Sequence, residues 1–203
     1  GVVRPLGNGF NGMSVFIIIN DRLAILGSIS GCLIILIDGI ADQGAGSKKG
    51  VLRSFLSLLD LKGSRFEATR VLGLLEMTGI KERFGLTADD LTSIARWVRD
   101  VNIRWGRDAS GRMRIGLPGL AENTWQAGID RLLLGYAMPG GDRRMFDGIL
   151  PYDHIEGSEA LVLGRFITFL QHLFEWAERL EQSMSPADWR DVFIELLERF
   201  IAV

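Results

Sequence analysis

Residues 87–100 read Thr-Ala-Asp-Asp-Leu-Thr-Ser-Ile-Ala-Arg-Trp-Val-Arg-Asp, and this stretch carries the clearest helix signal in the chain. Thr87 stands at the N-cap position, and Asp90 follows at the third helical position, where its carboxylate can bond back to the cap. The apolar residues then recur at helical spacing, at Leu91, Ile94, Ala95 and Val98. The pattern predicts an amphipathic helix with one apolar face, and it places Arg96 and Arg99 elsewhere on that helix.

Helical periodicity continues on the N-terminal side of this stretch. Residues 52–59 carry an apolar stripe, and Gly63 is placed to end that helix in a left-handed cap. Ser64 followed by Glu67 has the spacing of a capping box, which predicts the start of a second helix. Gly79 is then placed to end this second helix.

On the C-terminal side, the helical period is lost at residues 102–121, where glycine and proline recur and predict an irregular or hairpin-like excursion. Asn123 is then placed as the cap of a helix that runs to about Ala137. A long helix follows at 158–181, and the last helix has a capped start at 185–186 with proline at its first position. Together these signals predict a mainly α fold class.

Large aromatic residues at helical spacing are usually core residues. We therefore expect Trp97, Trp125 and Trp189 to pack in the core. Phe146 and Tyr152 belong to the loop before the long helix, and we expect both rings to anchor that loop.

Residues 1–40 differ from the rest of the chain, because they hold only four charged residues among many Ile, Leu and Gly. Their apolar blocks lie at 15–19, 23–26 and 33–37. A membrane span needs about 20 nearly unbroken apolar residues, whereas polar residues interrupt this run. Short apolar blocks between turn residues favour buried strands. We expect an N-terminal segment with strands at 1–45 and a helical domain at 46–203.

The composition excludes several function classes. The formal net charge is -2, so the chain as a whole has no basic signal for nucleic acid, and any DNA contact must come from a local patch. One cysteine and two separated histidines, His154 and His172, provide no zinc-type ligand set. The sequence also lacks a phosphate-binding loop, a nucleophile elbow and a nuclease-type acid arrangement. We predict no catalytic, cofactor-binding or metal-ligating residues.

One stretch concentrates basic residues, because 96–114 holds six arginines against two acids. Trp105 lies among them, and arginines beside an exposed ring can grip and stack a single strand of DNA. In the alternative interpretation, Trp105 packs its loop onto the helices while the flanking arginines pair with acids. The candidate DNA-binding residues are Arg96, Arg99, Arg104, Trp105, Arg107, Arg112 and Arg114.

Five short sequence motifs in and after this stretch point to a family. They read Asn-Ile-Arg-Trp-Gly-Arg-Asp at 102–108, Gly-Arg-Met-Arg-Ile-Gly-Leu-Pro-Gly-Leu at 111–120, Glu-Asn-Thr-Trp-Gln at 122–126, Asp-Arg-Leu-Leu-Leu-Gly-Tyr-Ala-Met at 130–138 and Ile-Leu-Pro-Tyr-Asp at 149–153. In this order and spacing they resemble the middle of the RecC family, the gamma subunit of bacterial exodeoxyribonuclease V. The resemblance starts near residues 40–43 and, after a gap, runs to the end of the chain, whereas 1–38 depart from it.

The resemblance implies an internal fragment of a RecC-like subunit, whose helicase-like fold has lost its ATPase motifs. Such subunits scaffold two motor subunits, the RecB-like and RecD-like partners, split the incoming duplex and line the channels for the single strands. This chain would correspond to the mainly helical insertion in the second motor-like half. The implied function is a non-catalytic scaffold and DNA-channel part of an ATP-dependent helicase-nuclease in double-strand-break repair and recombination, in contact with single-stranded DNA or a duplex end.

A second interpretation is a helical protein-interaction domain that contacts no nucleic acid. Local charge separates the two interpretations, since a continuous surface of the six arginines favours DNA and an exposed apolar groove favours a protein partner. The chain opens without the basic and apolar segments of a secretory leader, so we expect a cytoplasmic protein without membrane contact.

Overall fold

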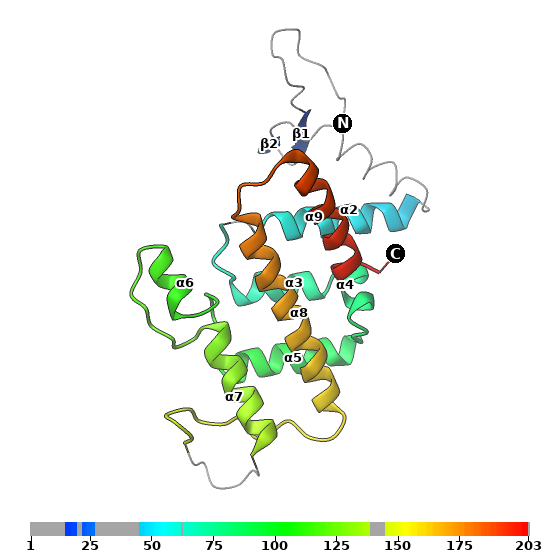
Figure 1. Cartoon of the computed structure of the whole chain (residues 1–203). Helices are drawn as coiled ribbons and strands as arrows, with labels where there is room; N and C mark the ends of the chain where they lie inside the picture. The colour runs from blue at the N-terminus through cyan, green and yellow to red at the C-terminus, as the bar shows by residue number, and fades with distance from the viewer. Residues whose placement is uncertain (1–14, 20–21, 27–44, 62, 139–144, 203) are drawn as a thin grey trace.

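The computed structural model of the chain describes residues 15–19, 22–26, 45–61, 63–138 and 145–202. The described helices are α2 (Ala45–Leu59), α3 (Ala68–Leu75), α4 (Thr78–Arg83), α5 (Ala88–Asp100), α6 (Ala109–Arg114), α7 (Trp125–Ala137), α8 (Glu159–Leu180) and α9 (Pro186–Phe200). The described strands are β1 (Val15–Ile19) and β2 (Arg22–Leu26). Helices dominate this part of the chain (Figure 1), and the predicted mainly α class is confirmed.

The two strands form an antiparallel pair in which Val15 lies opposite Leu26. The strand predictions at 15–19 and 23–26 are therefore confirmed, and the third apolar block, at 33–37, lies outside the described residues. Every helix of the described part of the chain is too short or too polar to cross a membrane.

Helix α8 is the centre of the hydrophobic core. In Figure 1 it runs across α2, α3 and α5, and it packs directly against α5 and α9. Its inward face is fully buried at Phe166, Phe169, Leu170 and Leu173. Apolar residues on this helix follow the spacing of one face, so burying that face against several helices stabilises the whole domain. The predicted long helix is confirmed.

The aromatic predictions are confirmed in part. Trp97 and Trp125 are fully buried, and Tyr152 is buried as the anchor of its loop. Trp189 packs against the core but stays half-buried. The expectation for Phe146 is wrong, because its side chain is 56% exposed. Its backbone closes a tight turn within its own loop instead of directing the ring into the helices.

Two predicted helix starts have the expected caps. The Thr87 hydroxyl accepts a hydrogen bond from the Asp90 N–H at 3.2 Å, and the Asp90 carboxylate accepts one from the Thr87 N–H at 2.8 Å. Ser185 and Asp188 make the same reciprocal pair at the start of α9. Each cap satisfies backbone donors that a helix start otherwise leaves without partners.

The predicted capping box at Ser64 is wrong. Helix α3 begins only at Ala68, and Glu67 precedes it without a side-chain cap bond. The Ser64 hydroxyl instead accepts a hydrogen bond from the Phe66 N–H at 3.3 Å, within a turn. The chain stays non-helical here because the Ala68 N–H donates to the carbonyl of Arg104 at 2.8 Å. A backbone pairing with a distant segment therefore outweighs the local signal.

Two helix boundaries also differ from the prediction. Gly79 lies inside α4 and does not end α3, which already ends at Leu75. Helix α7 is capped by Thr124, whose hydroxyl accepts from the Ala127 N–H at 3.3 Å. Asn123, the predicted cap, precedes it with a φ of 62°. Asparagine tolerates this left-handed conformation, so Asn123 turns the chain into the helix without capping it.

Candidate functional site

The backbone around Trp105 is held from two sides. The Gly106 N–H donates to the carbonyl of Arg65 at 2.7 Å, and the Gly106 carbonyl accepts from the Trp125 N–H at 3.0 Å. Gly106 has a φ of 83°, a conformation that favours glycine. These contacts bring Arg65 next to the arginine-rich stretch, although it is distant in sequence.

Arg112 is a structural residue at the centre of this region. Its side chain is only 6% exposed, and its guanidinium donates to the carbonyl of Leu120 at 2.7 Å and to that of Trp105 at 3.0 Å. The guanidinium carbon also lies 4.1 Å from the centre of the Trp105 ring. Arg112 therefore ties the segment 113–120 to Trp105, and its guanidinium is not presented to solvent as a phosphate ligand.

The helix that carries Arg112 was not predicted. Residues 109–114 form α6, where we expected an irregular excursion. The Asp108 carboxylate accepts from the Gly111 N–H at 2.6 Å and caps this helix. The aspartate was a usable start signal, but a helix of six residues that contains Gly111 is too short to show a helical period. In Figure 1, α6 projects from the side of the molecule beside α7.

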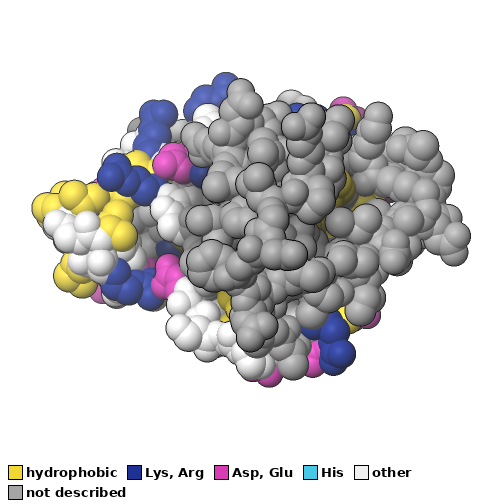
Figure 2. Space-filling view, turned by 90° about the horizontal axis from the view of Figure 1, so that it is seen from above, with side chains coloured by type: hydrophobic (Ala, Val, Ile, Leu, Met, Phe, Trp, Pro, Cys, Tyr) yellow, Lys and Arg dark blue, Asp and Glu magenta, His cyan; other side chains and the backbone are white. Residues whose placement is uncertain are grey.

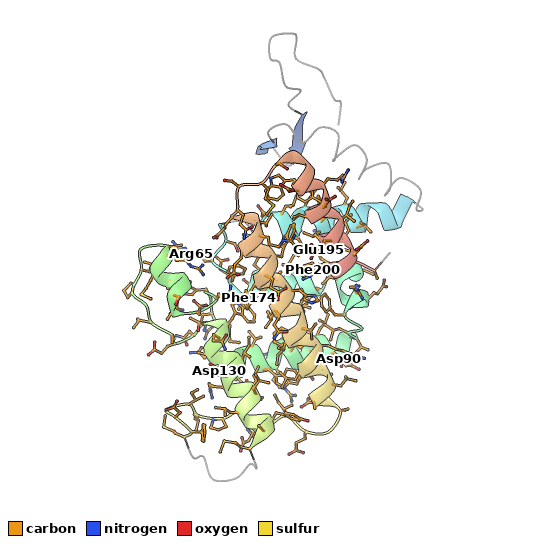
Figure 3. The ribbon with its side chains drawn as sticks, in the orientation of Figure 1. Arg65, Asp90, Asp130, Phe174, Glu195 and Phe200 are labelled. Carbon is orange, nitrogen blue, oxygen red and sulfur yellow. The ribbon has the colours of Figure 1, made fainter. Side chains whose placement is uncertain are left out.

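A small pocket of about 200 Å³ opens beside Trp105. Its basic residues are Arg65, Arg107, Arg112 and Arg114, and the facing residues of α8 are Phe174, Ala177 and Glu178. Figure 3 shows Arg65 next to α6 and Phe174 on the part of α8 that faces it. The pocket thus combines an aromatic ring, exposed cations and one acidic wall.

Arg107 is engaged within this pocket. Its guanidinium forms an ion pair with Glu178 and a second with Asp108 at 3.5 Å. The same group lies 5.4 Å from the ring centre of Phe174. Arg114 is exposed, and Arg65 is exposed with its guanidinium 5.9 Å from the Trp105 ring. Arg65 and Arg114 are therefore the pocket cations most open to solvent.

The remaining predicted arginines do not line this pocket. Arg96 pairs with Glu159 at 2.7 Å, at the start of α8. Arg104 is exposed, and its Nε donates to the side chain of Asn102 at 2.8 Å. Arg99 is exposed near the end of α5. The structure divides the six arginines, so they do not form one continuous basic surface.

Sequence reasoning missed Arg65 as a member of this group. No local signal could have found it, because Arg65 is distant in sequence from the arginine-rich stretch and only tertiary pairing brings it to Trp105. Trp105 itself is half-buried beneath the Arg112 guanidinium. This geometry agrees with the packing role that the sequence left open for the ring.

Three titratable residues outside the pocket, His154, His172 and Tyr152, are described by their neighbours and their burial. The His154 Nε2 lies 3.9 Å from a carboxylate oxygen of Asp153. Burial lowers the pKa of His172, and the charges of Arg199 and Arg83 lower it further. Tyr152 donates its hydroxyl proton to Asp100 at 2.8 Å, and burial together with this bond raises the pKa of Tyr152 to about 12. Among the described residues, no three His, Cys, Asp or Glu side chains are grouped to hold a metal ion.

Fold and site together define a mainly helical domain whose arginine-rich loop packs on a central aromatic helix. The family model for the fourth domain of the RecBCD enzyme subunit RecC matches residues 48–203. The chain therefore belongs to the RecC family, and the predicted family is confirmed.

Individual RecC proteins show the same relationship. The chain is 35% identical over 161 residues to the RecBCD enzyme subunit RecC of Escherichia coli. It is 36% identical over 152 residues to the RecC of Mycolicibacterium smegmatis and 31% identical over 161 residues to the RecC of Buchnera aphidicola from Acyrthosiphon pisum. These matches cover 75–79% of the chain but only 14–15% of each relative, so the chain spans about one seventh of their length.

Proposed function

We propose that residues 46–203 form a non-catalytic scaffold domain of a RecC-like subunit and that residues 1–45 are a separate segment. The subunit would act in the cytoplasm with RecB-like and RecD-like partners, in an ATP-dependent helicase-nuclease for double-strand-break repair and recombination. Family membership supports this proposal, together with a core in which α8 packs against α5 and α9. In this role, the packed helical core keeps the exposed surfaces of the domain in fixed positions.

We propose further that the surface beside Trp105 forms a small part of a DNA channel. The observation that carries this step is the pocket in which Arg65 and Arg114 remain exposed around an aromatic ring. An exposed arginine can bind a phosphate, whereas the guanidinium of Arg112 is already bound to two carbonyls. Arg104 is also exposed, but its Nε donates to Asn102 and it does not line this pocket.

The affinity of such a surface would be low. Phosphate contacts from Arg65 and Arg114, without hydrogen bonds to base edges, place binding in the non-specific range, ~10⁻⁴–10⁻⁶ M at physiological salt. Glu178 and Glu181 also line the pocket, so a phosphate approaching from the α8 side is repelled. Single strands or a duplex end should bind better than closed duplex, since an aromatic ring can stack only on an unpaired base.

The test is a titration of fluorescent single-stranded DNA at several salt concentrations. The Arg65→Ala/Arg114→Ala variant should bind more weakly, and its salt slope should fall by about one for each phosphate that it no longer binds. The matched control is Arg53→Ala/Arg190→Ala, which removes two exposed arginines elsewhere. Equal binding by the wild type and the Arg65→Ala/Arg114→Ala variant would refute the DNA surface.

The non-catalytic part of the proposal has its own test. The purified chain should neither hydrolyse ATP nor cut DNA with Mg²⁺ present, because its sequence contains no phosphate-binding loop and no nuclease-type acid arrangement. Turnover that is proportional to protein concentration and survives repurification would refute it.

The second candidate function is a protein-interaction domain without nucleic-acid contact. It is favoured by the exposed apolar side chains that follow the buried Arg112, at Met113, Ile115, Leu117 and Leu120. Figure 2 shows hydrophobic side chains gathered at the left end of the molecule, the side on which α6 lies in Figure 1. An exposed apolar patch of this kind marks an interaction surface. If no DNA binds even at low salt, this function replaces the DNA-channel role.

A further inference from the structure

A second and larger hollow, of about 780 Å³, lies between the start of α6, the first turns of α7 and the loop at 145–150. We call it the α6–α7 groove. Its lining residues include the charged Asp108, Glu122, Asp130 and Arg131 and the apolar Met145 and Leu150. None of them lines the pocket beside Trp105, so the two hollows are separate surfaces.

The walls of the α6–α7 groove are fixed by Arg131. Its Nε donates to the carbonyl of Leu150 at 2.9 Å, and its Nη1 donates to that of Val101 at 3.2 Å. The carbonyl of Arg131 also accepts from the Tyr152 N–H at 2.9 Å. One side chain therefore joins the end of α5, helix α7 and the loop, which makes the groove a preformed feature of the fold.

Two asparagines that line the groove are also held in place. The Asn102 side-chain amide donates to that of Asn123 at 2.6 Å, and both residues have a φ of 62°. Asparagine tolerates this conformation, and the bond between the two side chains joins the end of α5 to the segment before α7. A preformed surface loses little conformational entropy when a ligand binds.

The polar chemistry of the groove is acidic. Its carboxylates belong to Asp108, Glu122 and Asp130, and its one basic residue, Arg131, already donates to two carbonyls. Asp108 caps α6 and lies near Arg107, so its charge is partly balanced. Asp130 accepts from Gln126, and Glu122 is exposed without an ion pair in the described part of the chain. The net charge facing a ligand is negative.

Apolar side chains border the same carboxylates. Met145 is 65% exposed, and Leu150 and part of Ile149 also reach solvent. Together with Ala109 and Ala127 they give the groove an apolar lining. Its volume lies within the ~300–1,000 Å³ of ordinary ligand sites, and apolar lining with a few charged groups is their usual composition.

We propose that the α6–α7 groove docks a segment of a partner polypeptide that carries alternating apolar and basic side chains. Apolar side chains of that segment would cover Met145 and Leu150, and its lysines or arginines would pair with Glu122 and Asp130. The negative charge selects against a phosphate backbone and against an acidic segment. This proposal is independent of DNA binding beside Trp105, because that pocket has opposite charge and different residues.

The test uses a short synthetic peptide of alternating leucine and arginine, with a glutamate-for-arginine peptide as its counterpart. Carbon-13 labelling of the methionine methyl groups makes Met145 the reporter in the groove and Met113, 58% exposed and outside it, the matched control. We expect the basic peptide to shift the Met145 signal and not the Met113 signal, and the acidic peptide to shift neither.

Charge reversal supplies the second arm of the test. Glu122→Lys/Asp130→Lys should weaken binding of the basic peptide about tenfold or more, whereas Glu76→Lys/Glu82→Lys, at exposed acids elsewhere, should bind like the wild type. Glu122→Lys alone serves if the double variant is unfolded by circular dichroism. The proposal is overturned if both peptides bind alike, if Met113 responds instead of Met145, or if the lysine variants bind as the wild type does. A Met145 shift that follows protein concentration without peptide would assign the groove to a second copy of the chain and overturn it too.

Discussion

Replacing Arg112 by methionine tests whether this arginine holds the α6 loop or serves as a nucleic-acid ligand. Methionine keeps the apolar length of the side chain but removes the guanidinium. The carbonyls of Leu120 and Trp105 then lose donors at 2.7 and 3.0 Å, and the Trp105 ring loses the cation 4.1 Å from its centre. If the structural role is correct, the variant must be destabilised.

The magnitude follows from these interactions. Each hydrogen bond from a charged donor contributes about 1.5–3 kcal/mol, and a cation above an aromatic ring contributes about 0.5–2 kcal/mol. Arg112 is only 6% exposed, so removing its guanidinium also recovers part of a desolvation cost of several kcal/mol. Among the described residues, the Arg112 Nε has no hydrogen-bond partner, so the recovered desolvation cost is larger. We expect a net loss of about 2–4 kcal/mol in the free energy of unfolding.

The assay is urea denaturation followed by circular dichroism, with Arg114→Met as the exposed control. The control should stay within about 0.5 kcal/mol of the wild type. Arg112→Lys should recover little stability, because an ammonium group lacks the planar fork that reaches two carbonyls at once. Equal midpoints for Arg112→Met and Arg114→Met would refute the structural role and return Arg112 to the candidate DNA ligands.

Three further predictions concern the core, a close backbone approach and pH. Phe169→Ala should cost about 3–5 kcal/mol in urea denaturation because the ring is fully buried, and Trp189→Ala should cost less because it is half-buried. Gly135→Ala should lower the melting temperature, since a Cβ there would lie 1.7 Å from the carbonyl oxygen of Tyr152. In the control Gly164→Ala, the added Cβ meets no described atom within 4 Å, so this variant should stabilise α8 by about 1 kcal/mol. The free energy of unfolding should fall as the pH rises from about 10 to about 12, because the pKa of Tyr152 is about 12 in the folded state and the unfolded state loses that proton first. Tyr152→Phe should remove this fall in pH-dependent denaturation, and an unchanged alkaline profile would contradict the assignment.

Local sequence signals were sufficient for most of the helices. Thr87 with Asp90 and Ser185 with Asp188 predict their caps because the bonding partners lie three residues apart. The apolar stripe of α8 likewise predicts its buried face, since helical spacing alone decides which side chains share that face. The same reasoning failed at Ser64, where a pairing with residue 104 replaced the local cap.

The candidate site could be predicted only in part. Trp105 and its neighbouring arginines stand out in the sequence by their density, and three of these arginines, at 107, 112 and 114, do line the pocket. Their accessibility could not be predicted, because a buried and an exposed arginine are identical in sequence. Arg65 was missed because it comes from another segment.

The sequence by itself determined the mainly α class and the RecC family, because helical period, caps and ordered motifs are properties of neighbouring residues. Only the tertiary structure decided that Arg112 is buried against Trp105, that Arg65 joins the pocket and that the α6–α7 groove is acidic. The physical reason is that burial and local charge depend on which distant segments meet. Here backbone hydrogen bonds join the segments 65–68, 104–106 and 123–125, and the Arg131 side chain joins the walls of the α6–α7 groove.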